Sequence, residues 1–266
     1  MPMTPYQLFV EKWGKCRECS LWEGRQRVVL CRGKVPADVL FIGEGPGESE
    51  DSIGQPFIGP AGHLLDQILE QSGVTEHRYC LTNLVCCIPR LKPPVVVNIH
   101  HKAEYDIAIG RPSEWGNPWI IGRDGTRDEV IDRYAEYLQT KSTLLNKLPQ
   151  LSRKRLGCYC KPARCHGDVI VEAFNRLVSG KADEPPIEAI RACRPRLLEM
   201  VELARPRLIV CVGRLASKWL PDEAREGRSI IGIMHPAAVL RAELETQKQM
   251  AIRRCIVAIS DAVDGL

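Results

Sequence analysis

The sequence has few aromatic residues, 6% of 266, and no apolar run long enough to cross a membrane. Its start, MPMTPYQLFVEKWGK, lacks the apolar segment of a signal peptide. Charge of one sign does not dominate either, because the formal net charge is +4 and the pI is about 8.4. That balance allows a polyanionic partner without requiring one. We therefore expect a cytoplasmic or nucleoid protein, of cellular or phage origin, that has no membrane partner.

The chain also lacks the standard nucleotide-binding loops. Residues 39 to 62, VLFIGEGPGESEDSIGQPFIGPAG, have the pattern of a strand, a long glycine-rich turn and a helix start. The glycine spacing is neither G-x-G-x-x-G nor that of a P-loop. In a parallel α/β sheet such a turn builds a site beyond the carboxyl ends of the strands. Its acidic and aromatic side chains suit a neutral ligand or a leaving group better than a phosphate: Glu44, Glu48, Glu50, Asp51 and Phe57.

Cysteine, in contrast, is abundant, with twelve residues. In a reducing compartment so many thiols indicate metal binding more than disulfides. Several of them are grouped, and the first group is a C-x-x-C pair at Cys16 and Cys19, which alone is a weak signal.

The order of apolar patterns predicts alternating strands and helices. Strands are expected at residues 39–44, 79–85, 208–213 and 229–234, and a helix is expected up to Trp22. A segment of different composition interrupts this order. We predict a core of residues 1–92 and 185–266 and an inserted α/β domain of residues 93–184. The core is expected to be α/β, a three-layer α/β/α fold with a four-stranded, mostly parallel central sheet.

Five motifs of the core occur in an order known from one family. They are the N-terminal C-x-x-C; GEGPG followed by ED, GQPF and GPAG; TNLV with a cysteine beyond it; ACRPRL; and HPAAVLR. With these motifs the chain resembles the uracil-DNA glycosylase superfamily, in its iron–sulfur branch, over residues 6–90 and 186–260. The resemblance implies a DNA glycosylase that removes uracil or a related modified pyrimidine from DNA and leaves an abasic site. We expect the protein to act as a monomer.

The resemblance also implies a cofactor. Cys16, Cys19, Cys87 and Cys193 match the positions that ligate a [4Fe–4S] cluster in that branch. Cys86 is the competing neighbour of Cys87. The same four thiols would also suit a structural zinc ion, so both metals stay open.

Roles for the site residues follow from the chemistry of the implied reaction. Phe57 would stack on a flipped base, and the Asn83 amide would pair with uracil N3–H and O4. By analogy with the superfamily, His235 would donate to uracil O2, and backbone N–H groups around Gly45 would add a second donor. Glu44 would orient water or stabilise the cationic sugar. Glu50 is its competitor or forms a pocket wall.

Residues after His235 suit insertion into DNA. Ala238, Val239 and Leu240, with Ala237, would form an apolar wedge, and Arg241 would neutralise a phosphate. The chain departs from its relatives between Trp219 and His235, where they carry a longer basic stretch. DNA affinity is therefore expected to depend on other surfaces as well.

The insert resembles an uncharacterised phage and bacterial domain family with hallmarks GRPSxWGNP and CxCxPxxCHGDV. Because that family has no settled activity, the resemblance does not indicate a function for the insert. A helix is expected at residues 127–151. Arg111, Trp115 and Asn117 would either line a small nucleotide pocket or shape a loop. Four residues would form either a zinc site or a tight turn with free thiols: Cys158, Cys160, Cys165 and His166.

Two other functions fit the same pattern. The first is a non-catalytic DNA-binding module on the glycosylase fold. The second is a glycosylase that captures DNA covalently through a histidine in the interval where His100 and His101 fall, although the basic residues that flank this histidine in crosslinking relatives are absent here.

Overall fold

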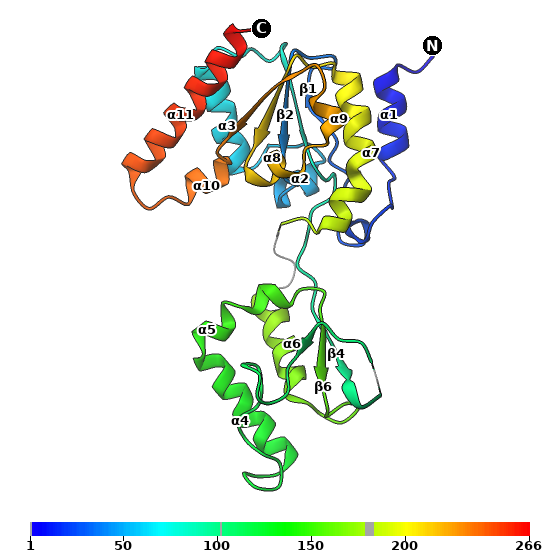
Figure 1. Ribbon diagram of the computed structural model, residues 1–266, viewed down its shortest axis with the longest axis vertical. Helices are drawn as coiled ribbons and strands as arrows, with labels where there is room; N and C mark the ends of the chain where they lie inside the picture. The colour runs from blue at the N-terminus through cyan, green and yellow to red at the C-terminus, as the bar shows by residue number, and fades with distance from the viewer. Residues whose placement is uncertain (1, 102, 179–183) are drawn as a thin grey trace. The chain divides into compact units, whose positions relative to one another are not determined.

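The computed structural model describes residues 2–101, 103–178 and 184–266, which form two compact units. One unit comprises Met1–Pro89 with Glu184–Leu266, and the other comprises Arg90–Asp183 (Figure 1). None of the helices in the described ranges is both long and apolar enough to span a bilayer.

The first unit is built on a five-stranded sheet in the order β1-β3-β2-β7-β8. The strands are β1 (Arg32–Gly33), β2 (Val39–Gly43), β3 (Tyr79–Asn83), β7 (Leu208–Val212) and β8 (Ser229–Ile233). All neighbours are parallel except β1, which pairs antiparallel with β3. The predicted α/β class is confirmed, but the expected number of four strands was wrong, because a two-residue edge strand is too short to show any periodicity.

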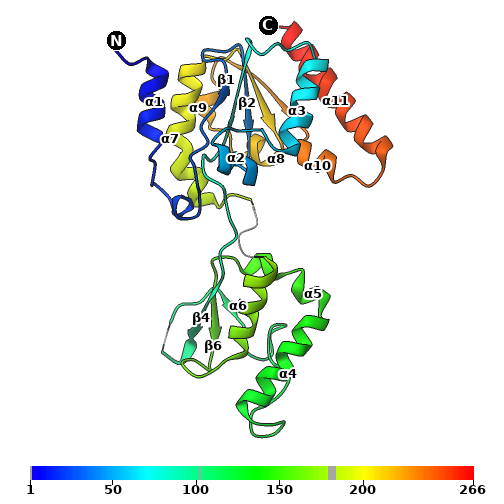
Figure 2. The ribbon, with the colours of Figure 1, turned by 180° about the vertical axis from the view of Figure 1, so that it is seen from behind.

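Helices cover both faces of this sheet, as the views in Figures 1 and 2 show. They are α1 (Pro5–Trp13), α2 (Glu48–Ile53), α3 (Pro60–Gln71), α7 (Ile187–Ala204), α8 (Arg214–Trp219), α9 (Asp222–Arg225), α10 (Pro236–Leu240) and α11 (Glu245–Asp264). Along β2, Leu40 and Ile42 pack with α1 and α7, while Val39 and Phe41 pack with α3 and α11. Successive strand residues point to opposite faces, so both sets are buried and the strand is apolar throughout.

Helix α1 is shorter than the sequence suggested. It begins with a capping box in which Thr4 and Gln7 bond each other's backbone N–H, and it ends at Gly14. The expectation of one helix up to Trp22 was therefore wrong. The chain makes a turn through the C-x-x-C pair and continues as a short 3₁₀ helix, Ser20–Glu23.

The strand order places a switch point between β2 and β7. The chain leaves β2 through α3 to β3 on one side, whereas β7 lies on the other side of β2 and is followed by β8. Ligands of open parallel sheets bind beyond the carboxyl ends of the strands at such a point. Gly43 of β2 pairs with Asn83 of β3, so both strands end at the same level.

The second unit has a three-stranded parallel sheet in the order β4-β6-β5. Its elements are β4 (Val95–Asn98), a 3₁₀ helix (Ile99–His101), β5 (Ile107–Ala108), α4 (Arg127–Thr140), α5 (Ser142–Leu145), a 3₁₀ helix (Leu148–Leu151), β6 (Arg155–Cys158) and α6 (His166–Leu177).

The expected single helix over residues 127–151 was wrong, because the chain leaves helical geometry at Lys141. In a straight helix Leu144 would be rotated by about 240° from Leu138. The break lets both leucines enter the same core.

A buried arginine links α7 to the end of β3. Arg196 is 0% exposed and is the largest fully buried side chain among the described residues. Its guanidinium donates to the Thr82 hydroxyl (2.9 Å), to the Leu84 carbonyl (3.0 Å) and to the Asn83 carbonyl. These bonds hold the backbone at the point where β3 delivers its last side chain.

Replacing Arg196 by Met is expected to destabilise the first unit, because it leaves three buried acceptors without a donor at a cost of about 1–3 kcal/mol each. Chemical denaturation followed by circular dichroism measures the loss. Arg194→Ala is the matched control. That arginine is half-exposed on the same helix and pairs with Glu223 at the surface, so its substitution should destabilise the unit far less than Arg196→Met does. Equal effects of the two substitutions would contradict the assigned role of Arg196.

Candidate active site

Four neighbouring parallel strands bring the candidate residues to one edge of the sheet. Glu44 follows β2, Asn83 ends β3, Gly213 follows β7, and His235 lies two residues beyond β8. They come from segments far apart in the sequence, so the sheet topology alone gathers them.

Phe57 and Asn83 meet above Gly43. A Cβ on Gly43 would lie 2.4 Å from the Asn83 Oδ1 atom and 2.5 Å from the Phe57 ring, so glycine is required there. Both residues are almost removed from solvent, since Asn83 is 3% exposed and Phe57 is 6% exposed. Phe57 has a φ of +56°, which is unusual for a bulky residue and indicates local strain. Gly62 permits this conformation, because a side chain there would collide with the Phe57 carbonyl.

Glu44 and His235 meet above Gly213. A Cβ on Gly213 would lie 2.9 Å from the Glu44 carboxylate and 3.1 Å from the His235 Cβ atom. Gly213 also has a φ of +96°, which L-residues rarely adopt. The turn after β7 therefore makes room for a carboxylate and an imidazole in close proximity.

The local backbone determines which nitrogen of His235 carries a proton. His235 is the N-cap of α10, and its Nδ1 accepts a hydrogen bond from the Ala237 N–H at 3.1 Å. The neutral ring therefore carries its proton on Nε2, which is then a hydrogen-bond donor. Burial, and then the positive charge of Arg241, lower the pKa of His235 below its ordinary value, so the ring is neutral at pH 7.

The two candidate carboxylates of the loop have different surroundings. Burial, followed by the Glu184 carboxylate, raises the pKa of Glu44, against the opposing effect of the Leu215 N–H. Glu50 instead accepts backbone hydrogen bonds from Gly47, Ile58 and Gly59 at 3.0–3.1 Å. Its carboxylate is thus occupied in bracing the loop, whereas the Glu44 carboxylate accepts one backbone hydrogen bond, from Leu215.

The residues predicted to insert into DNA differ in their exposure to solvent. Val239 is 1% exposed and packs in the core with α3 and α11, so the expectation that it contacts DNA was wrong. It lies on the inner side of the short helix α10. Ala238, Leu240 and Arg241 are exposed and stay candidates for contact with DNA.

Gly45 lies in the loop after β2, where a Cβ would come within 2.9 Å of Val85.

Five cysteines of the first unit gather between the N-terminal segment, the end of β3 and α7. The Cys86 sulfur lies 3.8 Å from that of Cys193 and 3.9 Å from that of Cys87, and it also hydrogen-bonds Cys16. Cys19 lies close enough to Cys16, Cys87 and Cys193 for their charges to affect its pKa.

Two guanidinium groups face these thiols. Arg25 donates to the Cys87 sulfur at 3.0 Å, and Arg196 hydrogen-bonds Cys193. The Arg196 Nε atom has no partner, and no carboxylate pairs with this buried cation within the described residues. A buried cation requires a nearby anion. The thiol-only donor set and this positive surrounding fit a metal–thiolate group of net negative charge.

A second group of thiols lies in the other unit. The ligand atoms of Cys158, Cys160, Cys165 and His166 all lie within 4.8 Å of one another. Cys158, Cys160 and His166 also line a cavity of about 130 Å³.

The loop of the second unit that carries Arg111, Trp115 and Asn117 is held by its own side chains. Arg111 donates to the carbonyls of Asn117 and Trp119, and Asn117 donates to that of Val130. Arg111 and Asn117 also line the cavity named above, whereas Trp115 packs in the core. The His100 ring packs against Tyr159, and the side chain of His101 lies outside the described residues.

Sequence reasoning missed Arg25, Arg196 and Gly213. A signal for Arg196 exists in ACRPRL, because Cys193 and Arg196 are three residues apart and share one helix face. Gly213 carries no such signal, since its importance comes from segments distant in sequence.

Comparison with known families identifies two regions. The model of the uracil DNA glycosylase superfamily matches residues 157–256, and the model described as a domain of unknown function, DUF4326, matches residues 97–176. The second match lies within the second unit. The first begins in that unit and continues through most of the later segment of the first unit.

Two similar proteins are named type-4 uracil-DNA glycosylases. That of Saccharolobus solfataricus is 40% identical over 88 residues, 33% of this chain and 41% of its own length. That of Thermotoga maritima is 40% identical over 83 residues, 31% of this chain and 43% of its own length. The chain thus spans about two fifths of the length of these relatives.

A phage protein of unknown function is also similar. The uncharacterized 12.4 kDa protein of Enterobacteria phage T4 is 40% identical over 87 residues, which are 31% of this chain and 78% of that protein. The chain is thus similar to the uracil DNA glycosylase superfamily over residues 157–256 and to the DUF4326 family over residues 97–176.

Proposed function

We propose that this chain hydrolyses the N-glycosidic bond of uracil, or of a related modified pyrimidine, in DNA and leaves an abasic site. The observation that carries the proposal is the meeting of two residue pairs at one sheet edge: Phe57 with Asn83, and Glu44 with His235. The similarity to proteins named type-4 uracil-DNA glycosylases supports it.

Recognition of the base would rest on Asn83 and Phe57. The Asn83 amide can accept from uracil N3–H and donate to O4, whereas cytosine presents the opposite pattern. A fixed amide therefore rejects cytosine by leaving polar groups unpaired. The bond from Arg196 to the Asn83 carbonyl fixes the backbone that carries this amide. Stacking on the Phe57 ring contributes about 1–3 kcal/mol.

Bond cleavage places negative charge on the base, mostly at O2, and positive charge on the sugar. The His235 Nε2–H is the donor for O2, because its Nδ1 is occupied by the Ala237 N–H. The backbone N–H of Gly45 would add a second donor. Glu44 would orient the attacking water or stabilise the cationic sugar.

Outside the pocket, Leu240 would press against the bases and Arg241 would contact a phosphate.

We also propose that Cys16, Cys19, Cys87 and Cys193 hold a [4Fe–4S] cluster. Arg25 and Arg196 would compensate its negative charge. When bound, the cluster would tie the N-terminal segment to β3 and α7. It would take no part in the cleavage.

Substitution of His235 by Ala is expected to reduce kcat by about 10²–10³-fold, because one donor to the developing oxyanion is lost. The assay follows alkali-induced breaks in single- and double-stranded oligonucleotides that contain uracil. His63→Ala, in an exposed histidine of α3, is the matched control and should be unaffected. A wild-type protein that binds these oligonucleotides without producing breaks would be a non-catalytic module. A protein–DNA band that survives denaturation would indicate covalent capture.

The rate is expected to fall on acidification. The pKa of His235 lies below 6.5, so the ring is neutral above that pH and gains a second proton only as the pH falls through its lowered pKa. Glu44, whose pKa is raised above 4.5, becomes protonated over the acid range as well. A pH profile of kcat/KM should therefore be flat near pH 7 and decline toward acid. Nitrogen NMR of His235 should show the proton on Nε2, and activity that rises on acidification would contradict the mechanism.

The cluster ligands are distinguished by two adjacent substitutions. Cys87→Ser should remove most of the bound iron and the visible absorbance of the purified protein, whereas Cys86→Ser should retain both. Iron per chain, measured by mass spectrometry, checks the prediction. Loss of iron from Cys86→Ser alone would transfer the ligand role to that residue. Zinc in place of iron at these cysteines would identify a structural zinc site.

A further inference from the structure

The second unit contains a donor set that the glycosylase chemistry does not use. Cys158 ends β6, Cys160 lies in the turn after it, Cys165 is the N-cap of α6, and His166 is the first residue of that helix. A strand end and a helix start thus bring three thiols and an imidazole together. Cys158, Cys165 and His166 are buried, and Cys160 is partly exposed.

The distances between donors suit a tetrahedral metal site. With zinc–sulfur bonds of about 2.3 Å, neighbouring sulfurs of a tetrahedron lie about 3.8 Å apart. Here the Cys158 and Cys165 sulfurs are 3.2 Å apart, and the His166 Nδ1 atom lies 3.9 Å and 3.8 Å from them. Small movements would therefore complete the tetrahedron. The sulfur separation is far above the roughly 2.05 Å of a disulfide.

The imidazole is oriented as a metal ligand. Its Nε2 atom lies 2.8 Å from the Ile109 carbonyl oxygen and donates to it. The neutral ring then has a free lone pair on Nδ1, directed at the sulfurs. Metal-binding histidines usually donate their other nitrogen in this way, which fixes the tautomer. The Tyr134 ring packs edge-on against the imidazole and holds it further.

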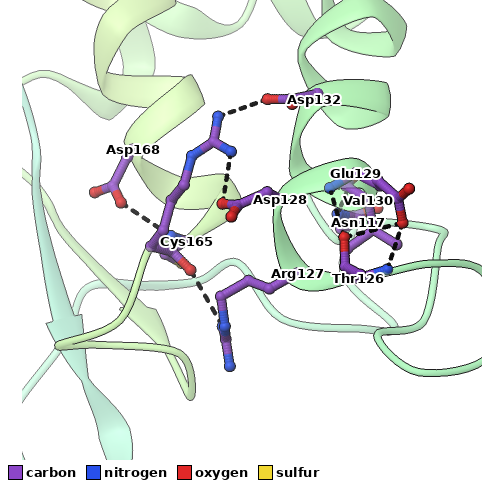
Figure 3. A network of polar contacts seen from close by, with 10 residues as sticks. Asn117, Thr126, Arg127, Asp128, Glu129, Val130, Asp132, Cys165 and Asp168 are labelled. Atoms are coloured by element: carbon purple, nitrogen blue, oxygen red, sulfur yellow. Dashed lines mark hydrogen bonds and ion pairs between the residues drawn. The ribbon is translucent and has the colours of Figure 1, made fainter.

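The segment that carries the thiols is braced on both sides, as Figure 3 shows for its contacts with α4 and α6. The Arg164 guanidinium pairs with Asp128 (2.8 Å) and Asp132 (2.6 Å) of α4. The Cys165 N–H donates to Asp168, whose other oxygen pairs with Lys161. The Asp168 carboxylate is thus occupied by these two partners, and the gathered donor set consists of sulfur and nitrogen atoms. Hard cations such as Mg²⁺ prefer oxygen, whereas zinc prefers thiolate and imidazole.

An ion can reach the donors from outside. The cavity of about 130 Å³ that Cys158, Cys160 and His166 line is also lined by Trp119 and Tyr159. The number of ligands, their spacing, the orientation of the imidazole and the access from outside therefore all fit a four-coordinate metal site.

We propose that Cys158, Cys160, Cys165 and His166 bind one zinc ion in a structural site of the second unit. Four protein ligands close the coordination sphere, so the ion joins β6 to α6 and activates no water. The proposal is independent of the glycosylase activity and of the core cysteines.

The test measures zinc and iron per full-length chain after growth with added zinc, and records X-ray absorption at the zinc edge, where iron does not interfere. One zinc per chain, with three sulfurs at about 2.3 Å and one nitrogen at about 2.0–2.1 Å, is expected. A wild-type chain without zinc would overturn the proposal and leave free thiols in a tight turn.

Variants assign the ion to these residues. Cys160→Ser and His166→Ala should weaken zinc binding by at least about 100-fold, since even residues that only support a ligand contribute 10–100-fold. His166→Cys should keep zinc with four sulfurs, a result that does not depend on loss of the fold. Cys255→Ser, a buried thiol on α11, is the control and should keep the wild-type spectrum. Zinc that persists in Cys160→Ser and His166→Ala but disappears in Cys19→Ser would place the ion in the core and refute the proposal.

Discussion

The buried guanidinium of Arg196 is the constraint on which the first unit depends. It crosses from α7 to the end of β3 and bonds the carbonyls of Asn83 and Leu84, so it fixes the backbone that presents the candidate base-reading amide. It also faces the Cys193 thiol. A charge without access to water is stable only beside an anion, so a metal–thiolate group would serve the fold as well as being held by it. Through this one side chain, the cysteine site and the candidate pocket share a support.

The candidate chemistry follows from where parallel strands end. Glu44 and His235 belong to segments almost 200 positions apart, yet the switch point between β2 and β7 places them over one glycine. Burial moves their pKa values in opposite directions, toward a neutral imidazole and a carboxyl of raised pKa. The Ala237 backbone N–H at the start of α10 bonds Nδ1 of His235, so the neutral ring carries its proton on Nε2. A donor and a carboxylate thus arise from sheet topology and a helix cap.

The two cysteine groups illustrate how one residue type serves different donor sets. In the first unit the thiols come with arginines and without histidine, which suits an anionic cluster. In the second unit three thiols accompany an imidazole held by a carbonyl, which suits a single borderline-soft cation. The first group brings the N-terminal segment, the end of β3 and α7 together, whereas the second lies at the turn between the consecutive elements β6 and α6.

Local patterns in the sequence determined the α/β class, most strands and the motifs of the site, because side-chain periodicity and glycine-rich turns are properties of neighbouring residues. They also drew attention to Asn83 and His235. Other features depended on tertiary contacts. The two-residue strand β1 exists only through its pairing with β3, and the break at Lys141 exists because Leu138 and Leu144 must enter one core. Likewise Glu50 braces the loop, Val239 turns inward, and Gly213 makes room for two side chains, since each role is set by atoms that only the folded chain brings within reach.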